Sequence, residues 1–231
     1  MSITPITEKR VLDVGLIALM EYMGSDLQVV NSARISYNKR HDSMLSGDDK
    51  LINFLMRERH GTPFESLVMT FHIKCPITVA REWMRHRIGS FNEVSGRYVK
   101  LEFEHYIPKK ARKQTGKPGN YVFEEIEDEE INDEFKTRLA ELYNYCYSEY
   151  SYFINELGIA KELARHALNL GLYTNFYWTV NARSLMNFIS LRGDDKAMLE
   201  IRQYAVAIEE IFETLYPITY KCFAGNGRRA P

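Results

Sequence analysis

The chain is poor in cysteine. Its 231 residues include only three, Cys75, Cys146 and Cys222, and these lie far apart. They form no C-x-x-C pair and no other spacing typical of metal ligands, so the sequence predicts no metal site. An odd number of cysteines without a secretion signal indicates reduced thiols, which are typical of a cytoplasmic protein.

The chain also lacks a long apolar run and an excess of charge of either sign. No stretch approaches the length of a transmembrane helix, and residues 1–10, MSITPITEKR, lack the apolar core of a signal peptide. We therefore expect a cytoplasmic protein with no membrane partner. The net charge is −1, from 30 Lys and Arg against 31 Asp and Glu, which argues against a broad surface for nucleic acid. Any phosphate should bind at a focused site.

The length suits one domain, residues 1–231, with a sizeable core. Alternating strand and helix patterns predict a mixed α/β or α+β fold. Residues 9–24 are compatible with a strand or a short helix. Strands are predicted at 67–75, 172–180 and, on a weaker pattern, 99–107. Helices are predicted at 26–36, 49–60, 77–87, 133–156, 159–169, 182–192 and 195–215.

Several residues are expected at helix ends. Asp26 and Asn181 are predicted to cap the helices that follow them, and Gly61 is expected just beyond the end of a helix. Pro76 suits the first turn of the next helix.

Two segments are predicted to lie on the surface. Residues 108–133 change from basic and Gly/Pro-bearing to acidic, which predicts a solvated surface excursion. The final GNGRRAP is expected to be frayed.

Tyr143, Tyr147 and Tyr150 recur at helical spacing and are interpreted as packing residues.

Residues 85–98, RHRIGSFNEVSGRY, are unusually polar. Arg85, Arg87 and Arg97 bring guanidinium groups, which bind phosphate through planar, bidentate hydrogen bonds. Asn, Glu and Ser side chains in the same segment offer donors and acceptors that could recognise the edge of a base or another ring system. The segment therefore predicts a site for a phosphorylated, ring-containing ligand.

A second polar segment lies near the C-terminal end. Arg183, Asn187 and Ser190 fall on one face of a predicted helix. A continuing helix would point Arg192 elsewhere, but Gly193 allows the helix to break there, so the direction of Arg192 stays open.

A third segment is KELARH, residues 161–166. Glu162 has Arg165 three residues later and His166 four residues later. Taken alone, this spacing predicts an ordinary surface ion pair worth about 0.3–0.5 kcal/mol.

The chain resembles the flavin-dependent thymidylate synthases. Arg85 through Ser95 match the family signature, RHR followed by seven residues and Ser. NSARIS at 31–36, RHGTPFE at 59–65 and LYTNFYWTVNARSLMNFISLR at 172–192 are similar as well. Separated matches in the same order are more specific than one motif. The resemblance covers most of the chain and implies an α+β fold with a central antiparallel sheet flanked by helices. It also implies a homotetramer whose active sites are shared between chains.

The resemblance implies an enzyme that methylates dUMP to dTMP. Methylenetetrahydrofolate supplies the carbon, and FAD reduced by NADPH supplies the hydride. By position, the FAD contacts fall on His60, Thr62, Glu65, Arg85, His86, Arg87, Glu93, Asn181, Arg183 and Asn187. The dUMP contacts fall on Glu82, Arg85, Glu93, Ser95, Gly96, Arg97, Arg165 and Arg192. Some members have a His where this chain has Lys196, so the role of Lys196 stays open.

The chemistry requires a uracil ring that is nucleophilic at C5. Arginine is always protonated. If Arg192 lies near N3 and the carbonyl groups of the uracil ring, its fixed positive charge would stabilise the anionic form of that ring. We therefore interpret Arg192 as the catalytic residue. Ser95 has no His–Asp pair to activate it and is interpreted as a nucleotide ligand. Cys75 lies in a predicted buried strand, where cysteine packs as a small hydrophobe. His86 stands between arginines that disfavour its protonation, so we interpret it as a flavin contact.

The same sequence features are compatible with two other hypotheses. A nucleic-acid-binding module would use the same arginines, but the near-neutral charge and the lack of a known DNA- or RNA-binding motif count against it. A structural homologue without activity is disfavoured because Arg85, Glu93, Ser95, Arg165 and Arg192 are all present. No G-x-G-x-x-G motif follows a strand, so NADPH is expected to share the folate cleft or to bind weakly.

Overall fold

The structure is a computed structural model that describes residues 4–118 and 120–231. The chain divides into two compact units. The first consists of the chain up to Lys74 together with Arg81–Asn92 and Asn175–Pro231, and the second consists of Cys75–Ala80 and Glu93–Thr174. The expectation of one domain over residues 1–231 stays a prediction.

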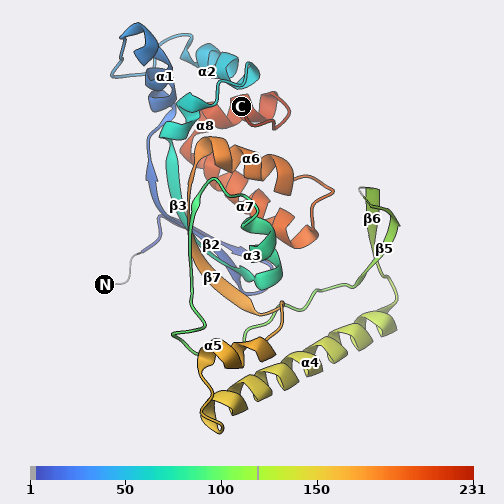
Figure 1. Cartoon of the computed structure of the whole chain (residues 1–231). Coiled ribbons are helices and arrows are strands. Elements are labelled where there is room, and N and C mark those ends of the chain that lie inside the picture. The colour runs from blue at the N-terminus through green and yellow to red at the C-terminus, as the bar shows by residue number, and fades with distance from the viewer. Residues whose placement is uncertain (1–3, 119) are drawn as a thin grey trace. The chain divides into compact units, whose positions relative to one another are not determined.

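A five-stranded sheet has the strand order β1-β2-β3-β7-β4. Figure 1 labels its three central strands, β2, β3 and β7. Its strands are β1 (Thr7–Val11), β2 (Gly15–Met23), β3 (Val68–Pro76), β4 (Ser90–Glu93) and β7 (Tyr173–Asn181). β1 and β3 both pair antiparallel with β2. β7 runs antiparallel to β3, because Ala182 N donates to Leu67 O at one end and Ile77 N donates to Leu172 O at the other. The predicted α+β fold with an antiparallel sheet is confirmed, and residues 9–24 form strands.

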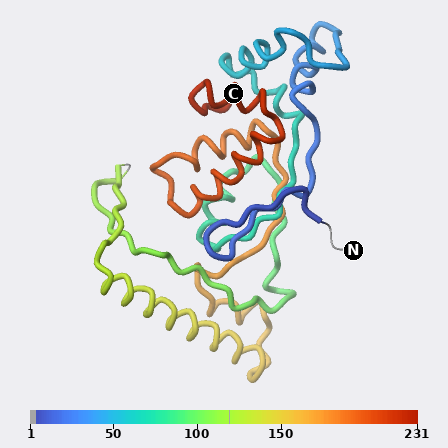
Figure 2. The backbone as a smooth tube through the Cα atoms, turned by 180° about the vertical axis from the view of Figure 1, so that it is seen from behind, coloured from blue at the N-terminus to red at the C-terminus, as the bar shows by residue number. Residues whose placement is uncertain are grey.

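The helices of the first unit pack beside these strands. They include α1 (Asp26–Arg34), α2 (Asp48–Arg57), α6 (Ala182–Arg192), α7 (Leu199–Leu215) and α8 (Pro217–Gly225), and α3 (Ile77–Trp83) ends in this unit. α6 and α7 lie on the same side of the strands in both opposite views (Figures 1 and 2). α7 contacts β1 and β2. Among the residues described, no helix is both long and apolar enough to cross a bilayer.

Aromatic rings fix the end of α3 against α6 and α7. The Trp83 ring lies 4.7 Å from Phe188, 5.4 Å from Trp178 and 5.7 Å from Tyr204, measured between ring centroids. All four residues are buried, and the Tyr204 hydroxyl donates to the Lys74 carbonyl at 2.8 Å. Aromatic pairs of this kind contribute about 0.5–1.5 kcal/mol each beyond the burial of their area. The RHR segment therefore begins from a rigid support.

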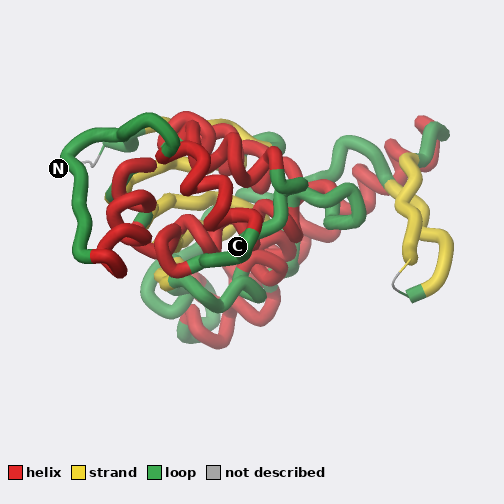
Figure 3. Tube along the Cα trace, turned by 90° about the horizontal axis from the view of Figure 1, so that it is seen from above, coloured by secondary structure: helices red, strands yellow, loops and turns green. Residues whose placement is uncertain are grey.

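The second unit contains a long helix and a hairpin. Its elements are β5 (Arg112–Lys117), β6 (Asn120–Glu125), α4 (Glu129–Asn155) and α5 (Lys161–Ala164), with a 3₁₀ turn at Arg165–Ala167. Asp128 caps α4 by accepting hydrogen bonds from the second and third residues of the helix. Figure 3 draws the strands of the first unit and of this hairpin in yellow. Almost all residues of β5 and β6 are exposed. Tyr143 and Tyr150 of α4 are buried, and the Tyr150 hydroxyl accepts from Leu101 N at 3.0 Å, which confirms their packing role.

Three predicted helix-end roles are wrong. The Asp26 carboxylate caps α8, not α1, because it accepts from Ile218 N at 3.0 Å and from Thr219 N at 2.9 Å. α2 ends at Arg57, before Gly61, and Arg59 is the residue that adopts a left-handed conformation, with φ 59°. Pro76 is the last residue of β3, not part of a helix.

Other predicted elements need smaller corrections. Residues 99–107 form no strand, and only a single bridge joins His105 to Leu172. The helix predicted at 77–87 ends at Trp83, and the helix predicted at 195–215 begins at Leu199. The C-terminal segment is not frayed, since α8 precedes it and Pro231 is buried.

Candidate active site

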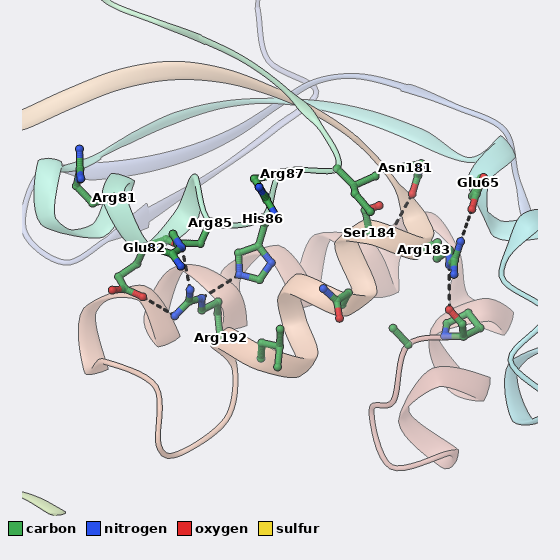
Figure 4. A pocket seen from close by; sticks show the side chains of 15 residues that line it. Glu65, Arg81, Glu82, Arg85, His86, Arg87, Asn181, Arg183, Ser184 and Arg192 are labelled. Atoms are coloured by element: carbon green, nitrogen blue, oxygen red, sulfur yellow. Dashed lines mark hydrogen bonds and ion pairs between the residues drawn. The ribbon is translucent and has the colours of Figure 1, made fainter. Parts of the chain in front are cut away.

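A cavity of about 1100 Å³ opens in the first unit. It is formed by the end of α3, the segment that follows it, and α6 (Figure 4). The lining residues are Glu65, Arg81, Glu82, Arg85, His86, Arg87, Ile88, Asn181, Arg183, Ser184, Asn187, Leu191, Arg192, Ala230 and Pro231. Small-molecule sites usually measure roughly 300–1,000 Å³, so this cavity has room for a large ligand.

Arg192 is anchored to the end of α3. Its Nη1 lies 2.6 Å from Glu82 Oε2, its Nη2 donates to the Glu82 carbonyl at 3.0 Å, and its Nε donates to His86 Nε2 at 2.9 Å (Figure 4). Arg192 is the last residue of α6, and Gly193 follows it as the C-cap. The Arg192 side chain, whose direction the sequence did not determine, therefore turns toward α3 and lines the cavity.

His86 is held as a neutral imidazole. Burial lowers the pKa of His86 to about 4, with the Arg192 charge as a second cause and the Glu82 carboxylate opposing both. A neutral ring nitrogen can accept the hydrogen bond that Arg192 donates, whereas a protonated ring has no acceptor. The sequence predicted the direction of this shift but assigned it to the neighbouring arginines in the chain. The structure assigns it to burial first.

Arg183 is held from two sides. Its Nη1 lies 2.7 Å from Glu65 Oε1, and its Nε donates to the main-chain oxygen of Pro231 at 3.1 Å. Gly61 makes room for this arrangement, since a Cβ there would lie 2.4 Å from Arg183 Nε. Asn181 caps α6 as predicted, because its side chain accepts from Ser184 N at 2.9 Å. The cap fixes the first turn of α6, which carries Arg183.

The cavity is strongly cationic. Five arginines line it against two glutamates, so three positive charges remain once the pairs are counted, although the whole chain has a net charge of −1. Arg85 and Arg87 are exposed, and neither forms an ion pair within residues 4–118 and 120–231. Guanidinium groups in this state are available for anions such as phosphate.

The second unit brings together another set of predicted ligands. Arg97 Nε lies 3.0 Å from Glu162 Oε2, and Arg165 Nε donates to the Glu162 carbonyl at 3.3 Å. Ser95 Oγ accepts from Arg97 N at 3.3 Å. A Cβ on Gly96 would approach Arg165 Cδ to 3.3 Å. These contacts gather the predicted nucleotide ligands of residues 95–97 and Arg165 in one region of the unit.

One acid and one thiol of the second unit, Glu93 and Cys75, have clear surroundings. Glu93 Oε1 accepts from Thr174 Oγ1 at 2.6 Å. Burial raises the pKa of the Cys75 thiol well above its usual range, with the Glu93 charge as a second cause. A buried neutral thiol is a poor nucleophile, which agrees with the packing role predicted for Cys75. Within the described part of the chain, no cluster of His, Cys, Asp and Glu could hold a metal ion.

The predicted residues thus fall into three groups. Those that line the cavity are Glu65, Glu82, Arg85, His86, Arg87, Asn181, Arg183, Asn187 and Arg192. Those in the second unit are Glu93, Ser95, Gly96, Arg97 and Arg165. His60 and Thr62 are exposed and do not line the cavity, and the His60 ring packs edge-on against Phe54 at 5.8 Å.

Several lining residues were missed from the sequence. Arg81 lies on α3, four residues before Arg85, which follows the end of that helix at Trp83. The spacing of the helix predicted at 77–87 could therefore have indicated Arg81. Ala230 and Pro231 carry no local signal of a ligand site. Lys196 lies exposed in the turn after α6, and nothing in its surroundings assigns it a role.

Comparison with known proteins defines the class. Residues 18–218 match the family described as "Thymidylate synthase complementing protein". A protein of Thermotoga neapolitana named "Flavin-dependent thymidylate synthase" is 47% identical, over 92% of this chain and 92% of its own length. A protein of Wolbachia pipientis wMel with the same name is 42% identical, over 94% of this chain and 76% of its own length.

A solved structure shows the same fold. The UMP/dUMP methylase PolB of Streptomyces cacaoi, bound with 5-Br dUMP, superimposes with a TM-score of 0.87 at 34% identity. The match covers 96% of this chain and 100% of that one. The chain therefore belongs to the flavin-dependent thymidylate synthase family, a family of enzymes.

Proposed function

We propose that this protein methylates dUMP to dTMP, with methylenetetrahydrofolate as carbon donor and with FAD, reduced by NADPH, as hydride source. The observation that carries the proposal is the cationic cavity, in which α3, the RHR segment and α6 bring five arginines together. A cavity of this charge suits ligands that carry phosphate, and all three of dUMP, FAD and NADPH do. The family membership agrees with this chemistry.

The cavity fits a flavin nucleotide. Its volume of about 1100 Å³ exceeds the usual range of small-molecule sites. Arg85, Arg87 and Arg183 would hold the phosphate groups, and the Asn181 and Asn187 side chains would meet polar edges of the ring system. When bound, the flavin would supply the hydride, while the protein positions the reactants and sets the local charge.

Arg192 would stabilise negative charge on the uracil ring. An arginine has five N–H donors, and three of them are engaged by Glu82 and His86, which leaves two for a ligand. The side chain is only 20% exposed, so its charge is weakly screened and acts more strongly than a surface charge. The Glu82 and His86 contacts fix its direction before the substrate arrives, which is the condition for electrostatic stabilisation of a transition state.

His86 would act as an orienting acceptor and not as a general base. Its neutral ring accepts the Arg192 hydrogen bond at 2.9 Å, and its low pKa keeps that acceptor available at neutral pH. Ser95, Arg97 and Arg165 would bind the nucleotide, and Gly96 would allow the close packing of Arg165. Glu93 would contribute an acceptor for either ligand.

We also propose a homotetramer with active sites shared between chains. Ile88 and Leu191 line the cavity yet are 74% and 57% exposed. Apolar side chains beside a charged site would lose contact with water if another chain covered them. Light scattering at micromolar concentration should then report an oligomer, and a fully active monomer would contradict the proposal.

The function is tested by reconstitution. The purified protein should gain an oxidised-flavin spectrum and thermal stability when FAD is added, because a ligand at 100 times its Kd stabilises the fold by about 2.7 kcal/mol. With dUMP, methylenetetrahydrofolate and NADPH it should then form dTMP, and omission of any one of these should stop the reaction. Protein that binds FAD without forming dTMP would be a structural homologue without activity, and protein that binds no FAD would contradict the proposal outright.

A further inference from the structure

The segment Asn226–Pro231, here called the C-terminal strap, is fastened to three helices. Asn226 Nδ2 donates to Asn53 Oδ1 of α2 at 2.8 Å. Arg228 Nε lies 2.7 Å from Glu209 Oε1 of α7, and the Arg228 carbonyl accepts from Ser190 Oγ of α6. The strap is therefore a built part of the first unit.

Arg228 is the central anchor of the strap. Its backbone is left-handed, with φ 52°, a conformation that non-glycine residues adopt only where surrounding contacts hold them. The Glu209 side chain is only 12% exposed, so its carboxylate needs a charged partner. The Arg228 side chain meets that need, while its carbonyl meets Ser190.

Two residues of the strap, Ala230 and Pro231, lie at the cavity beside Arg183. Ala230 and Pro231 form part of the cavity wall, and Pro231 is buried. The main-chain oxygen of Pro231 accepts from Arg183 Nε at 3.1 Å, while Glu65 holds Nη1 from the other side (Figure 4). The Arg183 side chain is still 49% exposed, so without these two contacts it would be free to change rotamer.

We propose that the C-terminal strap is a positioning element of the cavity, in which Arg228 holds Pro231 where its main-chain oxygen orients the Arg183 guanidinium toward a phosphate-bearing ligand. The inference rests on the proposed flavin site. An arginine that is already oriented loses less side-chain freedom when it binds, so fixing it raises affinity without adding a ligand contact. Ser190, Glu209 and Arg228 act through Arg183 and need not touch the ligand.

The test compares Arg228→Ala and a chain that ends at Gly227 with the unchanged protein. Arg229→Ala is the matched control, because Arg229 is exposed and forms no ion pair among the residues that the structure describes. Arg228→Lys tests rescue, since an ammonium can still reach Glu209. For each protein the measurements are the Kd for FAD by flavin fluorescence, the Tm of the flavin-free protein, and the rate at which phenylglyoxal modifies Arg183, read by peptide mass spectrometry.

We expect the Kd for FAD to rise about tenfold or more in Arg228→Ala and in the shortened chain, because a charge-assisted hydrogen bond loses its geometry. In the same two proteins, phenylglyoxal should modify Arg183 several times faster. Arg229→Ala should have the same Kd for FAD and the same modification rate as the unchanged protein. Arg228→Lys should recover part of the affinity for FAD. An unchanged or lower Kd for FAD, or a fall in Tm with no change at Arg183, would overturn the proposal.

The strap and the proposed function can fail separately. If the unchanged protein binds no FAD, the proposed function fails, yet the modification rate of Arg183 in the flavin-free protein still reports whether the strap holds the guanidinium. Equal rates in the unchanged and shortened chains would then overturn the strap as a positioning element.

Discussion

Replacement of Arg192 by alanine separates the chemistry on the uracil ring from the chemistry on the flavin. The change removes a charge-assisted contact of 2.6 Å to Glu82 and a hydrogen bond of 2.9 Å to His86. If the Arg192 charge stabilises the anionic ring, its loss should cost about 2.7–4 kcal/mol in the methylation step. That cost corresponds to a fall in rate of about 10²–10³-fold.

Flavin absorbance follows the two half-reactions one at a time. Reduction of FAD by NADPH should slow far less than methylation of dUMP by the pre-reduced enzyme. Arg192→Lys should recover only part of the methylation rate, because an ammonium cannot reproduce the three-way contact of the guanidinium with Glu82 and His86. Arg202→Ala is the control, since Arg202 also forms an ion pair, 2.8 Å from Asp195, but does not line the cavity.

One result would refute the reasoning. If Arg192→Ala reduces flavin poorly but methylates dUMP normally once reduced flavin is supplied, Arg192 serves the cofactor and not the uracil ring. A uniform loss of both half-reactions together with a large fall in Tm would instead point to a structural role at the end of α3.

Three further outcomes follow from the geometry. Ser95→Ala should raise the KM for dUMP and leave measurable turnover, because no base activates Ser95; complete loss of turnover with dUMP still bound would contradict this. Gly61→Ala should weaken FAD binding while the Tm changes little, since the new Cβ displaces the flexible end of Arg183 rather than backbone; unchanged affinity would show that Arg183 is not a ligand. The pKa of His86 is about 4 in the folded protein, against an ordinary value of 6.5. As the pH falls, the unfolded chain therefore takes up a proton at His86 before the folded protein does. The free energy of unfolding should be highest above pH 6.5 and should decrease as the pH falls from 6.5 toward 4. His86→Gln should flatten the Tm over that range, and an equal acid dependence in both proteins would assign the effect elsewhere.

Local signals predicted the elements that carry much of the cavity. Asn181 was expected to cap α6, and α6 runs over residues 182–192 as predicted. The cap and the apolar positions of that helix are encoded within a few residues of each other. β3 and β7 were also predicted within a residue of their observed ends, because β-branched and aromatic side chains dominate both.

Long-range contacts decided the positions that the sequence did not predict. Asp26 is the first residue of α1, but its carboxylate caps α8, which begins at Pro217. The sequence around Asp26 is the same whether the carboxylate caps its own helix or a distant one, so it could not distinguish the two. The direction of Arg192 depends on Glu82 and His86, which precede it by more than a hundred residues. The strap was expected to fray because GNGRRAP is rich in polar and flexible residues, and its order depends on Glu209 and Ser190 in other helices.

The near-neutral net charge of the chain explains why the sequence predicted a localised phosphate-binding site and not a broad cationic surface. A net charge of −1 gives the protein no broad attraction for polyanions, so affinity for phosphate must come from groups whose spacing is fixed. The structure gathers five arginines around one cavity and ties two of them, Arg183 and Arg192, to glutamates on opposite sides. Those glutamates reduce the repulsion among the guanidinium groups and hold their direction, while Arg85 and Arg87 keep their charge available. Arg192, which Glu82 and His86 fix in place, would give geometry to the reaction. Arg183, Arg85 and Arg87 would give affinity for the ligand, and Arg183 would do so because it is already oriented before the ligand binds.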